Sequence, residues 1–380
     1  MSQKEYDAIL VDTSIFDGNG LRLESGLLSK LKQFAKSDID FLMPDVIEHE
    51  ILAHLDKKIR VSRNALEKAI NDASSHLFFD GSILNDAKKL LVDSTEIEEL
   101  AKSRLEAFLK ATNALKLECD DYISVGELLK KYFSNEAPFS ETGKKKNEFP
   151  DAIILMAVEE WADQEGKSVL AVAKDNDWER YCQSSANIDH IDDLSKALSH
   201  FNTATAPYAL VESLKQSLDS SSAVGFLSKI ESSLELALLG FTPDQEADSQ
   251  FYWEADGASG RFNSFKFMEH DFTVVDTDTD TDTDTDTDKD WVVIEAWAEI
   301  TVEADGEFSL SAYDGIDRDY VGLNSITVTA EAEFQSEILI TISGDLSGDI
   351  NELDIDDVEI VDSITTMDFG ELELDYGDYY

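Results

Sequence analysis

The hydrophobic pattern changes along the chain, and this change constrains the fold more than any other feature. Before about residue 200, short continuous apolar runs alternate with stretches of helical periodicity. After about residue 245, apolar and polar residues alternate, as in WVVIEAWAEITVEA at 291–304. A short apolar run indicates a strand covered on both faces, whereas a period of two indicates a strand with one solvated face. The chain is therefore predicted to contain domains of two different classes.

The first domain is predicted to span residues 1–200 and to have an α/β fold. Apolar runs at 6–11, 39–43 and 168–173 predict buried strands. The remaining pattern predicts helices over residues 26–35, 44–55, 96–119 and 151–161. Strands that alternate with helices form a parallel sheet with helices on both faces. Ligands of such sheets bind at the carboxyl ends of the strands.

The second domain is predicted to span residues 245–380 and to be an acidic, antiparallel all-β domain, either a sandwich or a barrel. Two helical patterns between the domains predict a helical linker over 206–241. Residues 276–288 form an Asp-Thr repeat without apolar residues, and this composition predicts an extended solvated loop. Calcium binding by the repeat is the alternative, but the repeat lacks the glycine of an EF-hand-type loop.

The charge balance excludes a general affinity for polyanions. The chain has 31 Lys and Arg against 81 Asp and Glu, and its net charge of −50 divides into −13 for residues 1–200 and −37 for residues 201–380. Binding to nucleic acid or to an anionic membrane normally needs clustered basic residues. Any nucleic-acid function must therefore come from a local site.

The apolar stretches, the N-terminal residues and the cysteines favour a cytoplasmic protein. No apolar stretch approaches the length of about 18 residues that a membrane span needs, and the first residues lack a signal-peptide pattern. Cys119 and Cys182 have neither the spacing nor the histidine neighbours of a zinc site or a disulfide framework. We expect reduced thiols and no membrane contact.

Four carboxylates fall at positions where a parallel sheet gathers its ligands. Asp12 and Asp175 follow the first and the last predicted strands, and Asp151 opens a helix. Glu50 lies on the otherwise apolar face of a helix, where a carboxylate must be paired, protonated or bound to metal. Taken singly, each acid has an ordinary explanation as a capping residue, a turn residue or a buried Glu with a basic neighbour.

Taken together, these acids predict a metal site. Four carboxylates at one rim would repel each other by several kcal/mol, roughly, without a compensating charge. Divalent cations supply that charge, and a ligand set of oxygens favours Mg2+ or Mn2+ over Zn2+. Two ions about 4 Å apart can activate a water molecule and stabilise the leaving oxygen of a phosphodiester.

Basic residues flank these acids and are predicted to draw a phosphodiester to the site. They are Lys57, Lys58, Arg60 and Arg63 after Glu50, Lys144, Lys145 and Lys146 before Asp151, and Lys174 beside Asp175. A solvated basic loop is the alternative for Lys144, Lys145 and Lys146. His54, one turn after Glu50, either contacts a phosphate or is an ordinary core or surface histidine.

The segments VDTSIF, MPDVIEHEIL, KKNEFPDAIILMAVEEWA and VAKDNDW, in this order, resemble a PIN domain, a fold of metal-dependent ribonucleases with a five-stranded parallel sheet. The resemblance spans about residues 6–200. It implies an RNA substrate and a catalytic Mg2+ or Mn2+ site formed by Asp12, Glu50, Asp151 and Asp175. It also implies that Asp177 is an auxiliary ligand or an orienting group and that Thr13 or Ser14 is the small polar residue beside the first acid. Apart from the resemblance, Glu148 is a candidate to extend the site, because it stands three residues before Asp151.

The sequence departs from the family pattern in two places. Ala173 stands where many members carry Ser or Thr, and the stretch 55–150 is longer than in compact toxin-type members. This length resembles the larger bacterial PIN-like group. The leading hypothesis is a metal-dependent endoribonuclease. The alternatives are a catalytically silent PIN-fold binding module and a protein-interaction protein that acts through the acidic C-terminal domain.

Overall fold

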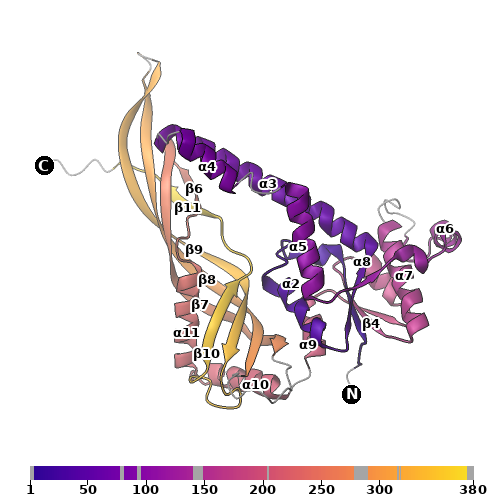
Figure 1. Cartoon of the computed structure of the whole chain (residues 1–380). Helices are drawn as coiled ribbons and strands as arrows, with labels where there is room; N and C mark the ends of the chain where they lie inside the picture. Colours follow the sequence, from indigo (N-terminus) through magenta and orange to yellow (C-terminus); the bar gives the residue numbers. More distant parts are fainter. Residues whose placement is uncertain are drawn as a thin grey trace. The chain divides into compact units, whose positions relative to one another are not determined.

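The computed structural model describes residues 4–77, 81–91, 96–139, 149–202, 205–277, 290–314, 316 and 318–374. The chain divides into two compact units, Met1–Phe201 and Asn202–Tyr380. Figure 1 shows the helices of the first unit around its sheet and the long strands of the second. None of the helices in the described ranges is both long enough and apolar enough to cross a membrane.

The N-terminal unit contains a five-stranded parallel sheet, as predicted. In spatial order its strands are β3 (Leu115–Leu117), β2 (Asp40–Pro44), β1 (Ala8–Val11), β4 (Val169–Val172) and β5 (Ile188–Ile191). Every residue of β1 and β4 is buried, which explains their continuous apolar runs. From β1 the chain builds outward through β2 and β3, then returns to place β4 and β5 on the other side. The strand order reverses between β1 and β4, where open α/β sheets bind ligands.

Helices surround this sheet. They are α1 (Thr13–Gly18), α2 (Gly26–Lys30), the 3-10 helix η1 (Leu31–Lys36), α3 (Asp45–Leu77), α4 (Gly81–Leu91), α5 (Ile97–Ala111), the 3-10 helix η2 (Cys119–Asp121), α6 (Val125–Ser134), α7 (Phe149–Glu165), α8 (Asn176–Cys182) and α9 (Leu194–Phe201). The helix that begins after β2 is much longer than the predicted range 44–55.

The prediction of a helix over 96–119 is wrong in its last third. Helix α5 ends at Ala111, and β3 and η2 follow it. Strand β3 has three residues, of which only Leu117 is buried, and such a short segment carries no detectable periodicity. Strand β5 has the sequence IDHI and was missed because its polar residues interrupt the apolar run.

The C-terminal unit contains a four-stranded antiparallel sheet, which confirms the predicted class. Its strands are β10 (Asp354–Ile360), β9 (Asp319–Ser343), β8 (Trp291–Asp314) and β7 (Tyr252–Thr277) in spatial order, and β6 (Asp244–Asp248) pairs with β11 (Thr366–Glu371) in a separate parallel pair. The strands β7, β8 and β9 are 26, 24 and 25 residues long, so one continuous three-stranded ribbon runs through the unit.

Two helices lie in the segment 206–241 that was predicted as a linker. They are α10 (Thr205–Asp219) and α11 (Val224–Ala237). Leu214 and Phe226 belong to the same buried cluster as Ile300 and Ile340 of the sheet. These helices therefore contribute to the core of the C-terminal unit.

The Asp-Thr repeat begins inside β7. Asp276 and Thr277 are its last two strand residues and are 7% and 6% exposed, so the repeat's first two positions are buried, contrary to the predicted solvated loop. The remainder of the repeat, 278–288, lies outside the described residues. Cys119 and Cys182 are both buried free thiols.

Candidate functional site

The ends of the two central strands bring Asp12 and Asp175 to the same edge of the sheet. Asp12 follows β1, and Asp175 comes three residues after the end of β4. Val11 and Val172 are partners in the parallel register. The backbone N–H of Asp12 donates to the carbonyl oxygen of Val172 at 2.9 Å, which extends the pairing of the strands to the first acid.

Asp12 is almost fully buried, with 6% of its surface exposed. It caps α1, and its Oδ2 accepts hydrogen bonds from the backbone N–H of Ser14 at 3.0 Å and from the Ser14 hydroxyl. Burial raises the pKa of Asp12, and the negative charge of Glu50 raises it further, while the bonds from Ser14 oppose this rise. Asp12 and Glu50 therefore interact electrostatically.

Glu50 reaches this edge from α3. Its Oε2 accepts a hydrogen bond of 2.8 Å from the hydroxyl of Thr13. On the same helix face, Ile47 and Ile51 are fully buried, Glu50 is half-buried and His54 is exposed. The face thus passes from the core to the rim of the sheet at Glu50. The hydrogen-bond partner of this carboxylate is therefore a hydroxyl. The structural explanation of Glu50 as a buried acid with a basic neighbour predicted a Lys or Arg there instead.

Asp151 lies in the first turn of α7, and its Oδ1 accepts a hydrogen bond of 3.0 Å from the indole Nε1 of Trp178. Burial raises the pKa of Asp151 to about 7. Repulsion from Asp12, Asp175 and Glu50 adds to this rise, and the bond from Trp178 opposes it. The four predicted carboxylates, carried by different parts of the unit, therefore interact at one site.

Asp175 and Asp177 differ in their surroundings. Asp175 is exposed and caps α8, where its Oδ1 accepts a hydrogen bond of 2.8 Å from the backbone N–H of Asp177. The carboxylate of Asp177 forms an ion pair with Arg180 on the next turn. The charge of Asp177 is thus already compensated within α8. Glu148 lies outside the described residues.

Sequence reasoning missed two supporting contacts. Trp178 is fully buried and orients Asp151, although it lies only three residues after Asp175 in the same motif. The backbone N–H of Lys174 donates to the hydroxyl of Ser14 at 3.3 Å, which joins the segments after β1 and β4. The contact between Trp178 and Asp151 had one signal in the sequence: Trp178 stands three residues after Asp175, a predicted ligand.

The donor set fits a hard divalent cation by its chemistry, because all four side chains offer carboxylate oxygens. Over the described ranges, no group of three or more His, Cys, Asp or Glu side chains is arranged to hold a metal ion. Hydrogen bonds from Ser14, Thr13 and Trp178 set the present side-chain orientations. Side-chain rotation is therefore needed to bring three of these carboxylates onto one ion.

The basic residues predicted to bind substrate lie in different settings. Lys57 and Lys58 are exposed on α3, and the Nζ of Lys58 donates to the carbonyl oxygen of Gly20 at 2.7 Å. Arg60 pairs with Asp56 one turn earlier at 3.1 Å. The Nζ of Lys174 lies over Gly18, at 3.3 Å from the position that a Cβ would occupy there. Lys144, Lys145 and Lys146 lie outside the described residues.

His54 is paired with an acid. Its Nδ1 lies 2.9 Å from Oδ2 and 3.1 Å from Oδ1 of Asp17, and both side chains are nearly half exposed. This histidine is therefore a surface residue held at the end of α1, one helical turn from Glu50.

A comparison with known protein families finds a match within the N-terminal unit. The family model of the PIN domain matches residues 9–178, a range that contains all four carboxylates and Trp178. The match does not extend into the C-terminal unit. No curated protein and no solved structure matches the chain.

Proposed function

Because the N-terminal half of this chain is a PIN domain, and this family generally consists of metal-dependent nucleases, we propose that the protein is a Mg2+- or Mn2+-dependent endoribonuclease. The observation that carries the proposal is the convergence of four carboxylates at one edge of the sheet, where burial of Asp151 and its repulsion by Asp12, Asp175 and Glu50 raise the pKa of Asp151 to about 7. Perturbed carboxylates that converge at the edge of a parallel sheet are typical of catalytic sites.

In the proposed mechanism, Asp12, Glu50, Asp151 and Asp175 hold the metal, and Asp177 is an auxiliary or orienting group. When bound, the metal polarises the phosphodiester and promotes attack by water. The hydroxyls of Thr13 and Ser14 orient Glu50 and Asp12. The indole of Trp178 holds Asp151 and, being fully buried, excludes water from that side of the carboxylate.

We propose that the RNA backbone is bound by cations around this site: Lys57, Lys58, Arg60, Lys144, Lys145, Lys146 and Lys174. Lys57 and Lys58 are exposed on the helix that carries Glu50, which supports their assignment. Arg60 must exchange its pairing with Asp56 for a phosphate. That exchange costs little, because exposed ion pairs contribute at most about 1 kcal/mol.

Two other functions have observations in their favour. The lack of three described carboxylates arranged around one point favours a catalytically silent binding module. In the acidic C-terminal unit, the ring of Tyr320 contacts those of Tyr252 and Tyr313, and each of the three residues is at least half exposed. Exposed aromatic residues are enriched at protein interfaces, which favours a protein partner for this unit.

The deciding experiment incubates the full chain with end-labelled RNA and with single-stranded DNA of the same sequence, in Mg2+, Mn2+ or EDTA. We expect internal cleavage of RNA with either metal and none in EDTA. RNA binding without cleavage in any metal would favour the silent binding module. Equal cleavage of both polymers would retain a nuclease and overturn the assignment to RNA.

A further inference from the structure

Two adjoining cavities follow helix α3 away from the carboxylate site. The first has a volume of about 340 Å3 and lies between Asp17, His54 and Lys57. The second has a volume of about 400 Å3 and extends toward α4 and α5. Leu21 and Lys58 line both cavities, so the two are neighbours along α3.

The position of these cavities is set by the periodicity of α3. Glu50, His54, Lys58 and Ser62 follow one another at intervals of four residues, so they lie along one face of the helix. With a rise of 1.5 Å per residue, Ser62 is about 18 Å from Glu50 along the axis. A nucleic-acid strand that leaves the carboxylate site along this face of α3 meets the first cavity after one helical turn. It meets the second cavity within three helical turns.

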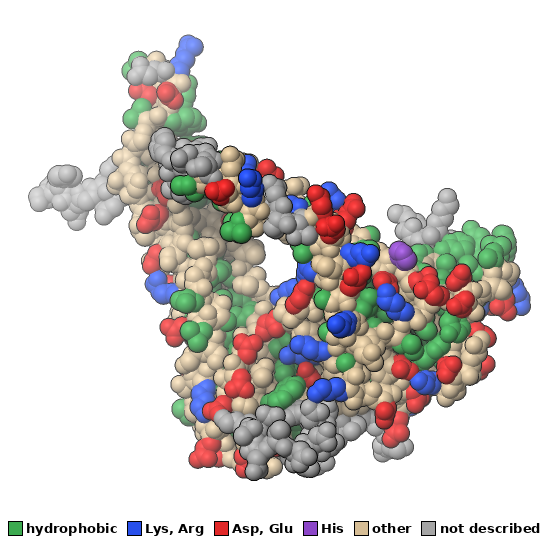
Figure 2. All heavy atoms as spheres, in the orientation of Figure 1, with side chains coloured by type: hydrophobic (Ala, Val, Ile, Leu, Met, Phe, Trp, Pro, Cys, Tyr) green, Lys and Arg blue, Asp and Glu red, His purple; other side chains and the backbone are tan. Residues whose placement is uncertain are grey.

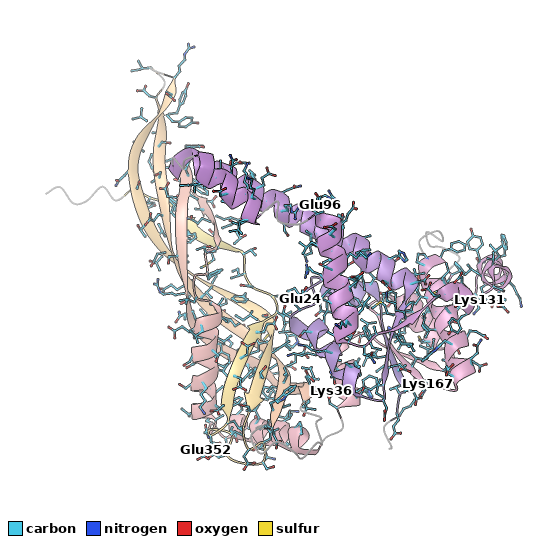
Figure 3. The ribbon with its side chains drawn as sticks, in the orientation of Figure 1. Glu24, Lys36, Glu96, Lys131, Lys167 and Glu352 are labelled. Carbon is cyan, nitrogen blue, oxygen red and sulfur yellow. The ribbon has the colours of Figure 1, made fainter. Side chains whose placement is uncertain are left out.

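The charge around the second cavity opposes that of the whole chain. Its lining includes Arg22, Lys58, Arg63 and Arg104, and no acidic side chain occurs among its described lining residues. Arg104 is held in place by Glu24 through bonds of 2.7 and 2.6 Å, and Figure 3 shows Glu24 beside α5. Figure 2 shows more Lys and Arg side chains on the visible face of the N-terminal unit than on that of the C-terminal unit. Beside this Arg104–Glu24 pair, the cavity is lined by Arg22, Lys58 and Arg63, and such a local cluster in a chain of net charge −50 favours an anionic ligand.

The floor of the second cavity is aliphatic. Leu55, Ile59 and Leu100 line it, of which Leu55 is fully buried and Ile59 and Leu100 are half-buried. Leu66 and Leu91 stand at its opening with 39% and 56% of their surfaces exposed. A nucleobase offers a flat apolar face next to an anionic phosphate, which matches an aliphatic floor beside a cationic rim. An acidic peptide matches the rim alone.

We propose that this second cavity, the α3 slot lined by Ser62, Arg63, Leu66, Leu91 and Arg22, binds one unpaired nucleotide of the RNA whose phosphodiester lies at the carboxylate site. The base packs on Leu66 and Leu91, and its phosphate lies between Arg22 and Arg63. A base-paired nucleotide cannot enter, because its faces are covered by its stacked neighbours. This inference rests on the proposed function, and it adds a base-binding subsite about 18 Å from Glu50.

Binding measurements in EDTA test the slot without relying on cleavage. The full chain is titrated against a fluorescent 10-nucleotide RNA and against a series in which each position in turn is abasic. We expect one abasic position to weaken binding by about fivefold and the others to have little effect. In the Leu66→Ser/Leu91→Ser variant that positional effect should vanish, while Leu90→Ser, which is 74% exposed and does not line the slot, should retain it.

The rim is tested with a matched pair on α3. Arg63→Ala should weaken binding about threefold and reduce the salt slope by about one, as expected for a phosphate contact. Lys68→Ala, an exposed position that lines neither cavity, should change neither quantity. Leu66, Lys68, Leu90 and Leu91 are exposed and Arg63 is half-buried, and circular dichroism checks that every variant remains folded.

Three outcomes overturn the slot: no position-dependent abasic effect, equal behaviour of slot and control variants, or competition by poly-aspartate as strong as that by RNA. The last would assign the cavity to acidic polypeptides. The nuclease proposal fails separately. If RNA binding shows the abasic effect but Mg2+ and Mn2+ support no cleavage, the nucleotide-binding slot is retained and the nuclease proposal is rejected. If RNA is cleaved but slot variants bind as the unmodified chain does, only the slot is rejected.

Discussion

The hydroxyl of Thr13 donates a hydrogen bond of 2.8 Å to Oε2 of Glu50. Thr13 is the first residue of α1, directly after Asp12, whereas Glu50 belongs to α3. This bond therefore connects the end of β1 to the helix that delivers the second carboxylate. It fixes one Glu50 oxygen and leaves the other available to a ligand.

Replacement of Thr13 by Val should weaken metal binding. Valine keeps the shape of threonine but cannot donate to Glu50. We expect the metal concentration for half-maximal cleavage to rise about 10- to 100-fold, as for other residues that orient ligands. The free energy of unfolding in EDTA should fall by about 1 kcal/mol. Thr13→Ser restores the donor and should recover most of the metal affinity. An unchanged metal requirement in Thr13→Val would remove Thr13 from the site.

Replacement of Asp151 by Asn should abolish cleavage and leave the fold intact. Asparagine retains the Oδ1 acceptor for Trp178 but loses the charge that holds a cation. We expect at least about a hundredfold loss of metal-dependent activity, since residues that merely orient ligands already cost about 10- to 100-fold. Asp163→Asn, at an exposed position of the same helix, is the matched control and should cleave normally. Equal activity of the two variants would contradict the site.

The stability of the metal-free protein should depend on the ionisation of Asp151. Its pKa is about 7 in the folded chain and near 3.8 ordinarily, so the folded state retains a proton that the unfolded state releases between these values. Stability from this group is therefore fully present below about pH 4 and is lost as the pH rises through 7.

Denaturant unfolding in EDTA measures this effect as a difference between two proteins. Asp151→Asn and the unmodified chain should be of similar stability at about pH 4. By about pH 8 the variant should be more stable by roughly 2 kcal/mol, because a neutral asparagine carries no charge into the buried site and is not repelled by Asp12, Asp175 and Glu50. A difference that stays constant with pH would show that the pKa of Asp151 is not raised in the folded chain.

In the C-terminal unit, Gly260→Ala should be strongly destabilising. A Cβ at this position of β7 would lie 2.2 Å from the ring of Phe241 and 3.0 Å from its carbonyl oxygen. The backbone N–H of Gly260 bonds to that same carbonyl at 2.8 Å, so the two segments cannot separate without losing the bond. We expect a loss of about 2 kcal/mol in unfolding free energy. Gly322→Ala in β9, where a Cβ meets no atom within 4 Å, is the control and should be neutral or slightly stabilising.

Local pattern was sufficient for the central elements of the first unit. The apolar runs of β1 and β4 predicted buried strands because every side chain of these strands is covered. The positions of Asp12 and Asp175 after these strands, and of Glu50 on an apolar helix face, then predicted an acidic rim. The period of two in 291–304 likewise predicted a sheet with one polar face. Each of these inferences depends on neighbours within about ten residues in the sequence.

Tertiary structure alone decided which of these elements meet. Packing between distant segments places β1 beside β4, Thr13 against Glu50 and Trp178 against Asp151. Local spacing in the sequence does not encode these contacts. The short strand β3 and the core positions of α10 and α11 escaped prediction for the same reason, since their neighbours lie far away in the sequence. The sequence by itself determined the positions of the acids, the buried strands β1 and β4 and the alternating pattern of the C-terminal strands. The fold determined their distances, and the repulsion of carboxylates depends on distance.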